Sequence, residues 1–179
     1  GPTDTGDAID IGPLIRHEHV QRVSSYLDVA SEDGANVVLD GRREFVGTGF
    51  FLGPSVVDQV TPEMRMAREE IFGPVLSVMR ADNLETALAF GDQCEYGNGA
   101  SIFTRDGFAA REFREHFNVG MIGVNVGVPA PMAWFPFTGW NSSFFGDLHV
   151  QGMEGIKFYT RQKVVFSRWD DAYARHQGW

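Results

Sequence analysis

The chain has 179 residues, which suits one domain or part of a larger one. Hydrophobic residues make up 43% and aromatic residues 13%, so a packed core is expected and disorder of the whole chain is excluded. The formal net charge of -9 argues against a broad nucleic-acid-binding surface. No apolar run reaches the roughly 18 residues of a transmembrane helix, so neither a nucleic acid nor a membrane is expected as a partner.

The cysteine and histidine content restricts the kinds of site that the chain can build. Cys94 is the single cysteine, which excludes an internal disulfide and favours a reducing compartment, for which we take the cytoplasm. The five histidines are scattered and form no ligand motif, so no metal site is predicted.

The first half of the chain alternates between helical and strand-like patterns. Apolar residues at helical spacing, from Val20 to Ala30, predict a helix that Gly34 closes. Gly73-Pro74 ends the next helical pattern. The predicted elements are a helix over 14–31, strands over 36–41 and 50–57, a short helix over 62–70 and a strand over 75–79.

The second half continues the same alternation. A capping box at Asp82 and a cap at Asp106 each predict the start of a helix. Strands are predicted over 100–104 and 119–126, an ordered loop over 127–150, and a final strand around Val164–Phe166. The rhythm predicts an α/β fold with a mostly parallel sheet flanked by helices.

Three features are candidates for function. Cys94 has neither a second cysteine nearby nor a helix N-terminus, which favours a packed residue over a nucleophile. Glu69–Pro74 is either a helix end with solvated carboxylates or a turn whose carboxylate and aromatic ring hold a ribose and a flat ring. The aromatic run 128–137 suits a substrate pocket and an interface equally.

Several motifs, in order along the chain, resemble the aldehyde dehydrogenase family. They are Ile11–Ile15, Glu69–Val75 (EEIFGPV), Tyr96–Thr104 (YGNGASIFT) and Gly120–Asn125 (GMIGVN). The later runs Pro136–Asn141 (PFTGWN), Ser143–His149 (SFFGDLH), Phe158–Thr160 and Arg168-Trp169 are similar to the methylmalonate- or malonate-semialdehyde subgroup. The resemblance identifies the chain as the C-terminal portion of such an enzyme.

The resemblance also implies roles for individual residues. Glu70 would contact the nicotinamide ribose of NAD, Phe72 would lie by the nicotinamide, and Phe137 would lie near the substrate. Asn125 would support the pocket, and the strand within 158–169 would belong to an oligomerisation region. By the same resemblance, residues 1–157 are part of the catalytic domain and 170–179 are a tail, in a homo-oligomer.

The resemblance implies a covalent mechanism in which a cysteine thiolate attacks a semialdehyde, hydride passes to NAD, and CoA takes the acyl group with loss of CO2. By the resemblance, the nucleophilic cysteine and the NAD domain would lie upstream of this chain, and Cys94 matches no catalytic position. The chain is therefore expected to hold no catalytic residue, to bind no cofactor tightly and to be inactive alone. Two alternatives stay open: a standalone, non-catalytic module for oligomerisation or binding, and a dehydrogenase of another substrate class.

Overall fold

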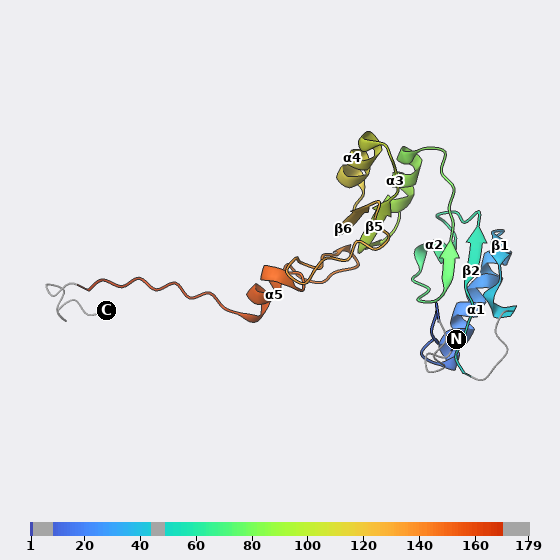
Figure 1. The fold of residues 1–179 in the computed structure, drawn as a ribbon, viewed down its shortest axis with the longest axis horizontal. Coiled ribbons are helices and arrows are strands. Elements are labelled where there is room, and N and C mark those ends of the chain that lie inside the picture. Colours follow the sequence, from blue (N-terminus) through green and yellow to red (C-terminus); the bar gives the residue numbers. More distant parts are fainter. Residues whose placement is uncertain (2–8, 44–48, 170–179) are drawn as a thin grey trace.

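The computed structural model describes residues 1, 9–43 and 49–169, which form two lobes joined after β3 (Figure 1). In the first lobe β2 is the central strand, antiparallel to β1 and parallel to β3. The elements of this lobe are α1 (His17–Glu32), β1 (Asn36–Leu39), the 3-10 turn η1 (Gly41–Arg43), β2 (Ser55–Asp58), α2 (Arg65–Arg68) and β3 (Val75–Ser77).

The core of the first lobe lies between α1 and the three-stranded sheet. Val23, Tyr26, Leu27 and Ala30 recur at helical spacing on one face of α1 and are fully buried. They pack in one cluster with Val57 of β2 and with residues around α2. Complete burial of a leucine or valine contributes about 1.5–3 kcal/mol, so this face fixes α1 against the sheet and against the segment that follows α2.

The second lobe consists of short strands beside two helices. β5 and β6 pair in parallel through the crossover helix α4, while β4 pairs antiparallel with β7. Helices α3 and α4 lie next to each other (Figure 1). The elements are α3 (Leu84–Asp92), β4 (Tyr96–Gly97), β5 (Gly99–Ile102), α4 (Gly107–His116), β6 (Met121–Val124) and β7 (Trp140–Asn141).

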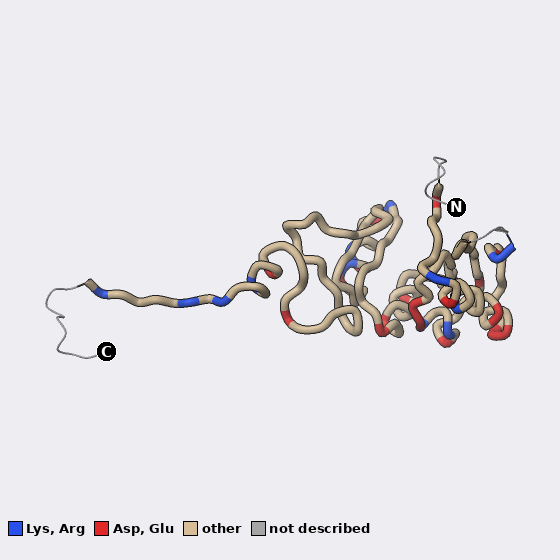
Figure 2. The backbone as a smooth tube through the Cα atoms, turned by 90° about the horizontal axis from the view of Figure 1, so that it is seen from below, with Lys and Arg blue, Asp and Glu red and all other residues tan. Residues whose placement is uncertain are grey.

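The chain leaves the second lobe through α5 (Gly152–Tyr159), and residues 160–169 then extend away from both lobes (Figure 1). The charged side chains of this arm are cationic: Arg161, Lys163 and Arg168 (Figure 2). The strand predicted around Val164–Phe166 is not formed, because a strand needs a ladder partner and no described residue forms a β-ladder with these three residues. The predicted tail 170–179 lies outside the described residues.

The α/β content is confirmed, but the prediction of one mostly parallel sheet is wrong. The described residues form three small sheets, of which one is mixed, one antiparallel and one parallel. The second strand is shorter than predicted, since residues 50–54 contain Gly53-Pro54 and the proline has no N–H for a ladder. The helix expected over 62–70 is reduced to the single turn of α2.

The structure also tests the predicted helix caps. The Asp106 carboxylate accepts a hydrogen bond from the Phe108 amide at 2.8 Å, as predicted. The capping box at Asp82 is wrong by one residue: the Asn83 side chain accepts from the Thr86 amide at 2.8 Å. An amide oxygen caps as well as a carboxylate. Among the helices that the structure describes, none has the length and apolar character needed to cross a membrane.

Candidate functional site

The turn between α2 and β3 presents two of the predicted site residues. Phe72 lies in left-handed backbone (φ 56°), and its ring is 75% exposed. The two residues are Glu70 and Phe72, which flank Ile71 in the chain. Ile71 is buried in the core, so Glu70 and Phe72 both face outward. Within the described chain, the Glu70 carboxylate accepts no hydrogen bond, which leaves both oxygens available to a ligand's hydroxyl groups.

Two adjoining hollows open beside this turn. The first, of about 380 Å³, is lined by His19, Arg22, Glu69, Glu70, Phe72 and Tyr96. The second, of about 550 Å³, shares Glu69, Glu70 and Tyr96 and adds Phe137, Cys94 and residues that directly follow β4 and β7. Glu70 thus lies between Phe72 on one side and Phe137 on the other. The structure therefore brings all three predicted site residues to one cleft.

Phe137 is positioned by the long loop that the sequence predicted as ordered. Its backbone N–H donates to the Val150 carbonyl at 2.8 Å, which closes the part of the loop that contains β7. Behind the loop, the Asn125 side chain accepts from the Thr104 amide at 2.9 Å and donates to the Thr104 carbonyl at 3.1 Å. These bonds join the segments that directly follow β5 and β6.

Glu69, next to Glu70, has a different environment. One carboxylate oxygen accepts from Nε of Arg65 at 2.7 Å, and the other accepts from the buried Tyr26 hydroxyl at 2.5 Å. The Arg65 hydrogen bond, followed by the Tyr26 bond and the positive charge of Arg65, lowers the pKa of Glu69. The two adjacent carboxylates thus differ in their partners. The Glu69 carboxylate is bonded to other residues of the protein, whereas the Glu70 carboxylate is open to the cleft.

This environment predicts a pH dependence of stability. Because the pKa of Glu69 is lower in the folded chain, its contribution is fully present above the ordinary value of 4.5 and is lost as pH falls through the lowered value. We expect Glu69→Gln to reduce the loss of stability on acidification below about pH 4.5, measured by urea unfolding at several pH values. Glu32→Gln, at the exposed end of α1, is the control, and equal acid slopes in both variants would contradict the prediction.

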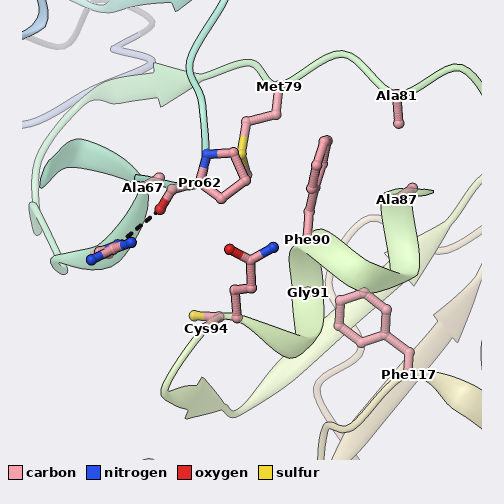
Figure 3. Close-up of a pocket in the computed structure, with 11 residues that line it drawn as sticks. Pro62, Ala67, Met79, Ala81, Ala87, Phe90, Gly91, Cys94 and Phe117 are labelled. Atoms are coloured by element: carbon pink, nitrogen blue, oxygen red, sulfur yellow. Dashed lines mark hydrogen bonds between the residues drawn. The ribbon is translucent and has the colours of Figure 1, made fainter. Parts of the chain in front are cut away.

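Cys94 lies in the second hollow and also lines a third one, of about 340 Å³, between the two lobes (Figure 3). The third hollow is mostly apolar, with Pro62 and Met79 from the first lobe facing Phe90 from the second. The Cys94 backbone N–H donates to the Gly91 carbonyl at 3.0 Å, so the residue follows the C-terminal end of α3. The negative end of a helix dipole does not stabilise a thiolate.

No group of three or more metal-ligating side chains occurs in the described ranges, so nothing there provides a metal centre. The cleft instead combines an open carboxylate, exposed aromatic rings and backbone groups. Such a surface suits an organic ligand with hydroxyl groups and a flat ring.

Comparison with known proteins decides the family. The aldehyde dehydrogenase family model matches residues 2–165. The chain belongs to the aldehyde dehydrogenase family. It is 48% identical to a malonate-semialdehyde dehydrogenase of Halalkalibacterium halodurans, over 91% of this chain and 34% of the relative. It is 52% identical to malonate-semialdehyde dehydrogenase 1 of Geobacillus kaustophilus, over 88% of this chain and 33% of the relative.

Solved aldehyde dehydrogenase structures agree with the fold. A methylmalonate-semialdehyde dehydrogenase from Oceanimonas doudoroffii superposes with a TM-score of 0.88 at 47% identity, over 94% of this chain and 35% of that one. A protein from Sinorhizobium meliloti 1021, assigned to the same activity and crystallised with NAD, gives a TM-score of 0.87 at 49% identity, over 90% and 33%. The chain thus spans about a third of the length of these relatives.

The prediction that the chain is the C-terminal portion of such an enzyme is wrong. The matched stretch, residues 2–165, covers 34% of the Halalkalibacterium relative and corresponds to the N-terminal part of the homologues. Motifs such as EEIFGPV identify a family without fixing where a stretch lies in the parent chain. The expectation that the nucleophile lies upstream of this chain therefore loses its support, and the activity of the chain depends on the residues that it contains.

Several residues of the cleft in this aldehyde dehydrogenase chain were not predicted from the sequence. Tyr96 lines both hollows beside Glu70, and the nearby negative side chain of Glu95, through a hydrogen bond and its charge, raises the pKa of Tyr96. His19, Arg22 and Tyr26 contact the turn from α1. Their only signal in the sequence is a spacing of three and four residues, which places them on one helix face.

Proposed function

We propose that the protein carrying this chain is an NAD-dependent, CoA-acylating dehydrogenase of malonate or methylmalonate semialdehyde, in which CO2 is lost and an acyl-CoA is formed. The single observation that carries this is the cleft in which Glu70 lies between Phe72 and Phe137. The relatives named above support the substrate class. NAD, when bound, accepts the hydride of the aldehyde carbon.

Each residue has a proposed role that its geometry allows. Glu70 would accept hydrogen bonds from the nicotinamide ribose, since its carboxylate is exposed and unpaired within the described chain. Phe72 would cover the nicotinamide ring with its own exposed ring. Phe137, half-buried in the opposite wall, would pack against the aldehyde substrate. These positions orient two reactants and exclude water between them.

The test is an assay of NADH formation by the whole protein with malonate or methylmalonate semialdehyde, with and without CoA. We expect turnover that depends on CoA, with acyl-CoA and CO2 as products. Turnover with water in place of CoA would point to a non-acylating dehydrogenase, and rapid oxidation of unrelated aldehydes would indicate another substrate class. The isolated 179-residue chain should form no NADH, because it spans a third of the relatives and its sole cysteine is not activated.

Substitution of Cys94 tests whether the thiol in the cleft is the nucleophile of the reaction. Cys94→Ser should leave the turnover of the whole protein unchanged within about twofold, since Cys94 follows the C-terminal end of α3 and not the N-terminal end of a helix, where a nucleophilic thiol is favoured. The measurement is steady-state NADH formation together with labelling by iodoacetamide. A loss of activity by two or more orders of magnitude would instead make Cys94 the nucleophile.

The arm supports the proposal of a homo-oligomer. Val164, Val165, Phe166 and Trp169 are each at least 71% exposed, an arrangement that is unfavourable unless another surface covers them. We place the oligomerisation region at residues 158–169 on this basis. The same observation favours the second candidate function, a non-catalytic module for oligomerisation, which CoA-dependent turnover by the whole protein would exclude.

A further inference from the structure

We infer that His19 and Arg22 of α1 are positioning residues, which hold the Glu70–Phe72 turn so that its carboxylate and ring face the cleft. Neither residue belongs to the family motifs that mark the turn. The inference rests on the proposed function for its consequence, NAD binding, while the contacts themselves are independent of that function.

The turn does not hold itself in place. Phe72 lies at a positive φ of 56°, a conformation that is costly for a residue with a side chain. Its ring is 75% exposed and therefore contributes little packing. A backbone of this kind persists only where its surroundings fix it, so contacts from other elements must do so.

Those contacts come from one face of α1. Nε2 of His19 lies 2.7 Å from the Phe72 carbonyl oxygen, and because a carbonyl only accepts, the imidazole must donate. Nη2 of Arg22 donates to the Glu70 carbonyl at 3.2 Å. The Tyr26 hydroxyl donates to the Glu69 carboxylate at 2.5 Å. We call these three contacts the α1 ladder.

The α1 ladder has a regular order. Residues 19, 22 and 26 follow one another along a single helix face, and they meet residues 72, 70 and 69 in the opposite direction. Helix and turn therefore run antiparallel, with one contact for about each helical turn. Buried Ile71 fills the space between the two bonded carbonyls and fixes the depth of the turn against the core.

The ladder leaves the functional side chains unused. At Glu70 and Phe72 the bonds go to backbone carbonyls, so the carboxylate and the ring stay directed into the hollow that His19 and Arg22 also line. The His19 and Phe72 ring centroids are 6.4 Å apart, with the ring planes tilted by 59°, which adds an aromatic contact to the hydrogen bond. Loss of the ladder would therefore misdirect the groups without removing them.

The test compares four variants of the whole protein. His19→Ala and Arg22→Ala each remove one hydrogen bond to a backbone carbonyl of the turn. His19→Gln keeps a donor near the Phe72 carbonyl, and His17→Ala is the control. His17 is exposed on the same helix and contacts Gln21 at 3.1 Å, away from the turn. The readouts are amide hydrogen exchange in residues 69–74 without ligand and the KM values for NAD and for the aldehyde.

We expect about fivefold faster exchange and an NAD KM about fivefold higher in both alanine variants, from the loss of one hydrogen bond, with the aldehyde KM unchanged. His17→Ala and His19→Gln should stay near the wild type. Equal exchange in His19→Ala, Arg22→Ala and the wild type would overturn the inference, as would an equal rise of both KM values. A wild-type protein that forms no NADH would overturn the proposed function alone, since the exchange experiment still decides the ladder.

Discussion

Replacement of Gly73 by alanine should lower the free energy of unfolding by about 1–3 kcal/mol, the usual cost of forcing extra volume into a packed core. A Cβ at this position would lie 2.7 Å from both γ-methyl carbons of Val23 and 3.3 Å from its Cβ. Val23 is fully buried on the face of α1 that packs on the sheet, so its side chain has no free space to move into. The helix or the turn must then move.

Urea unfolding of the Gly73→Ala and Gly127→Ala variants measures this effect. Gly127 is the matched control, because an added Cβ there meets nothing within 4 Å. The control should be neutral or slightly more stable, since alanine reduces the entropy of the unfolded chain. Equal stability of Gly73→Ala and the wild type would mean that Val23 of α1 does not pack against Gly73 as closely as in the structure.

The same substitution bears on function through the geometry of the turn. Gly73 follows Phe72 directly, and Val23 lies beside Arg22, whose side chain donates to the Glu70 carbonyl. Separation of α1 from the turn would stretch the hydrogen bonds that His19 and Arg22 make. Reduced NAD affinity is therefore expected together with reduced stability in Gly73→Ala.

The helices were the part of the fold that local sequence could predict. α1 begins at His17 and ends at Glu32, against a prediction of 14–31, because its apolar residues follow the helical period. The predicted cap at Asp106 gave the correct start of α4, whereas the cap predicted at Asp82 is one residue before the observed cap of α3, Asn83. Helical periodicity and capping both depend on residues within about one helical turn of each other. A short stretch of sequence is therefore enough to predict a helix.

The sheets and the cleft depend on contacts that no local pattern specifies. β4 at Tyr96 pairs with β7 at Asn141, in the middle of a segment predicted as a loop. The final strand was predicted from apolar residues alone, although a strand also requires a partner. Glu70 and Phe137 were linked only by resemblance to a family, and the hollow that joins them forms from residues of both lobes.

Glu70→Gln should lower the NAD affinity or the hydride-transfer rate of the whole protein by about 10- to 100-fold, the range for loss of a hydrogen bond to a charged group. The amide keeps the size of the side chain and one acceptor oxygen, but it loses the negative charge that strengthens bonds to ribose hydroxyls. Stability should barely change, because no described residue donates to the Glu70 carboxylate in the folded chain. Stopped-flow NADH formation with titration of NAD separates the affinity from the rate.

Glu69→Gln provides the opposite pattern within the same motif. Its carboxylate is bonded to Arg65 and Tyr26, so the expected change is in acid stability, with a smaller effect on NAD. Glu32→Gln, far from the turn on α1, should change neither property. If Glu70→Gln matched the wild type in both NAD affinity and rate, the carboxylate would have no role toward the cofactor. The cleft would then need another polar group to orient the ribose, and Tyr96, which lines both hollows, is the described residue that is placed to do so.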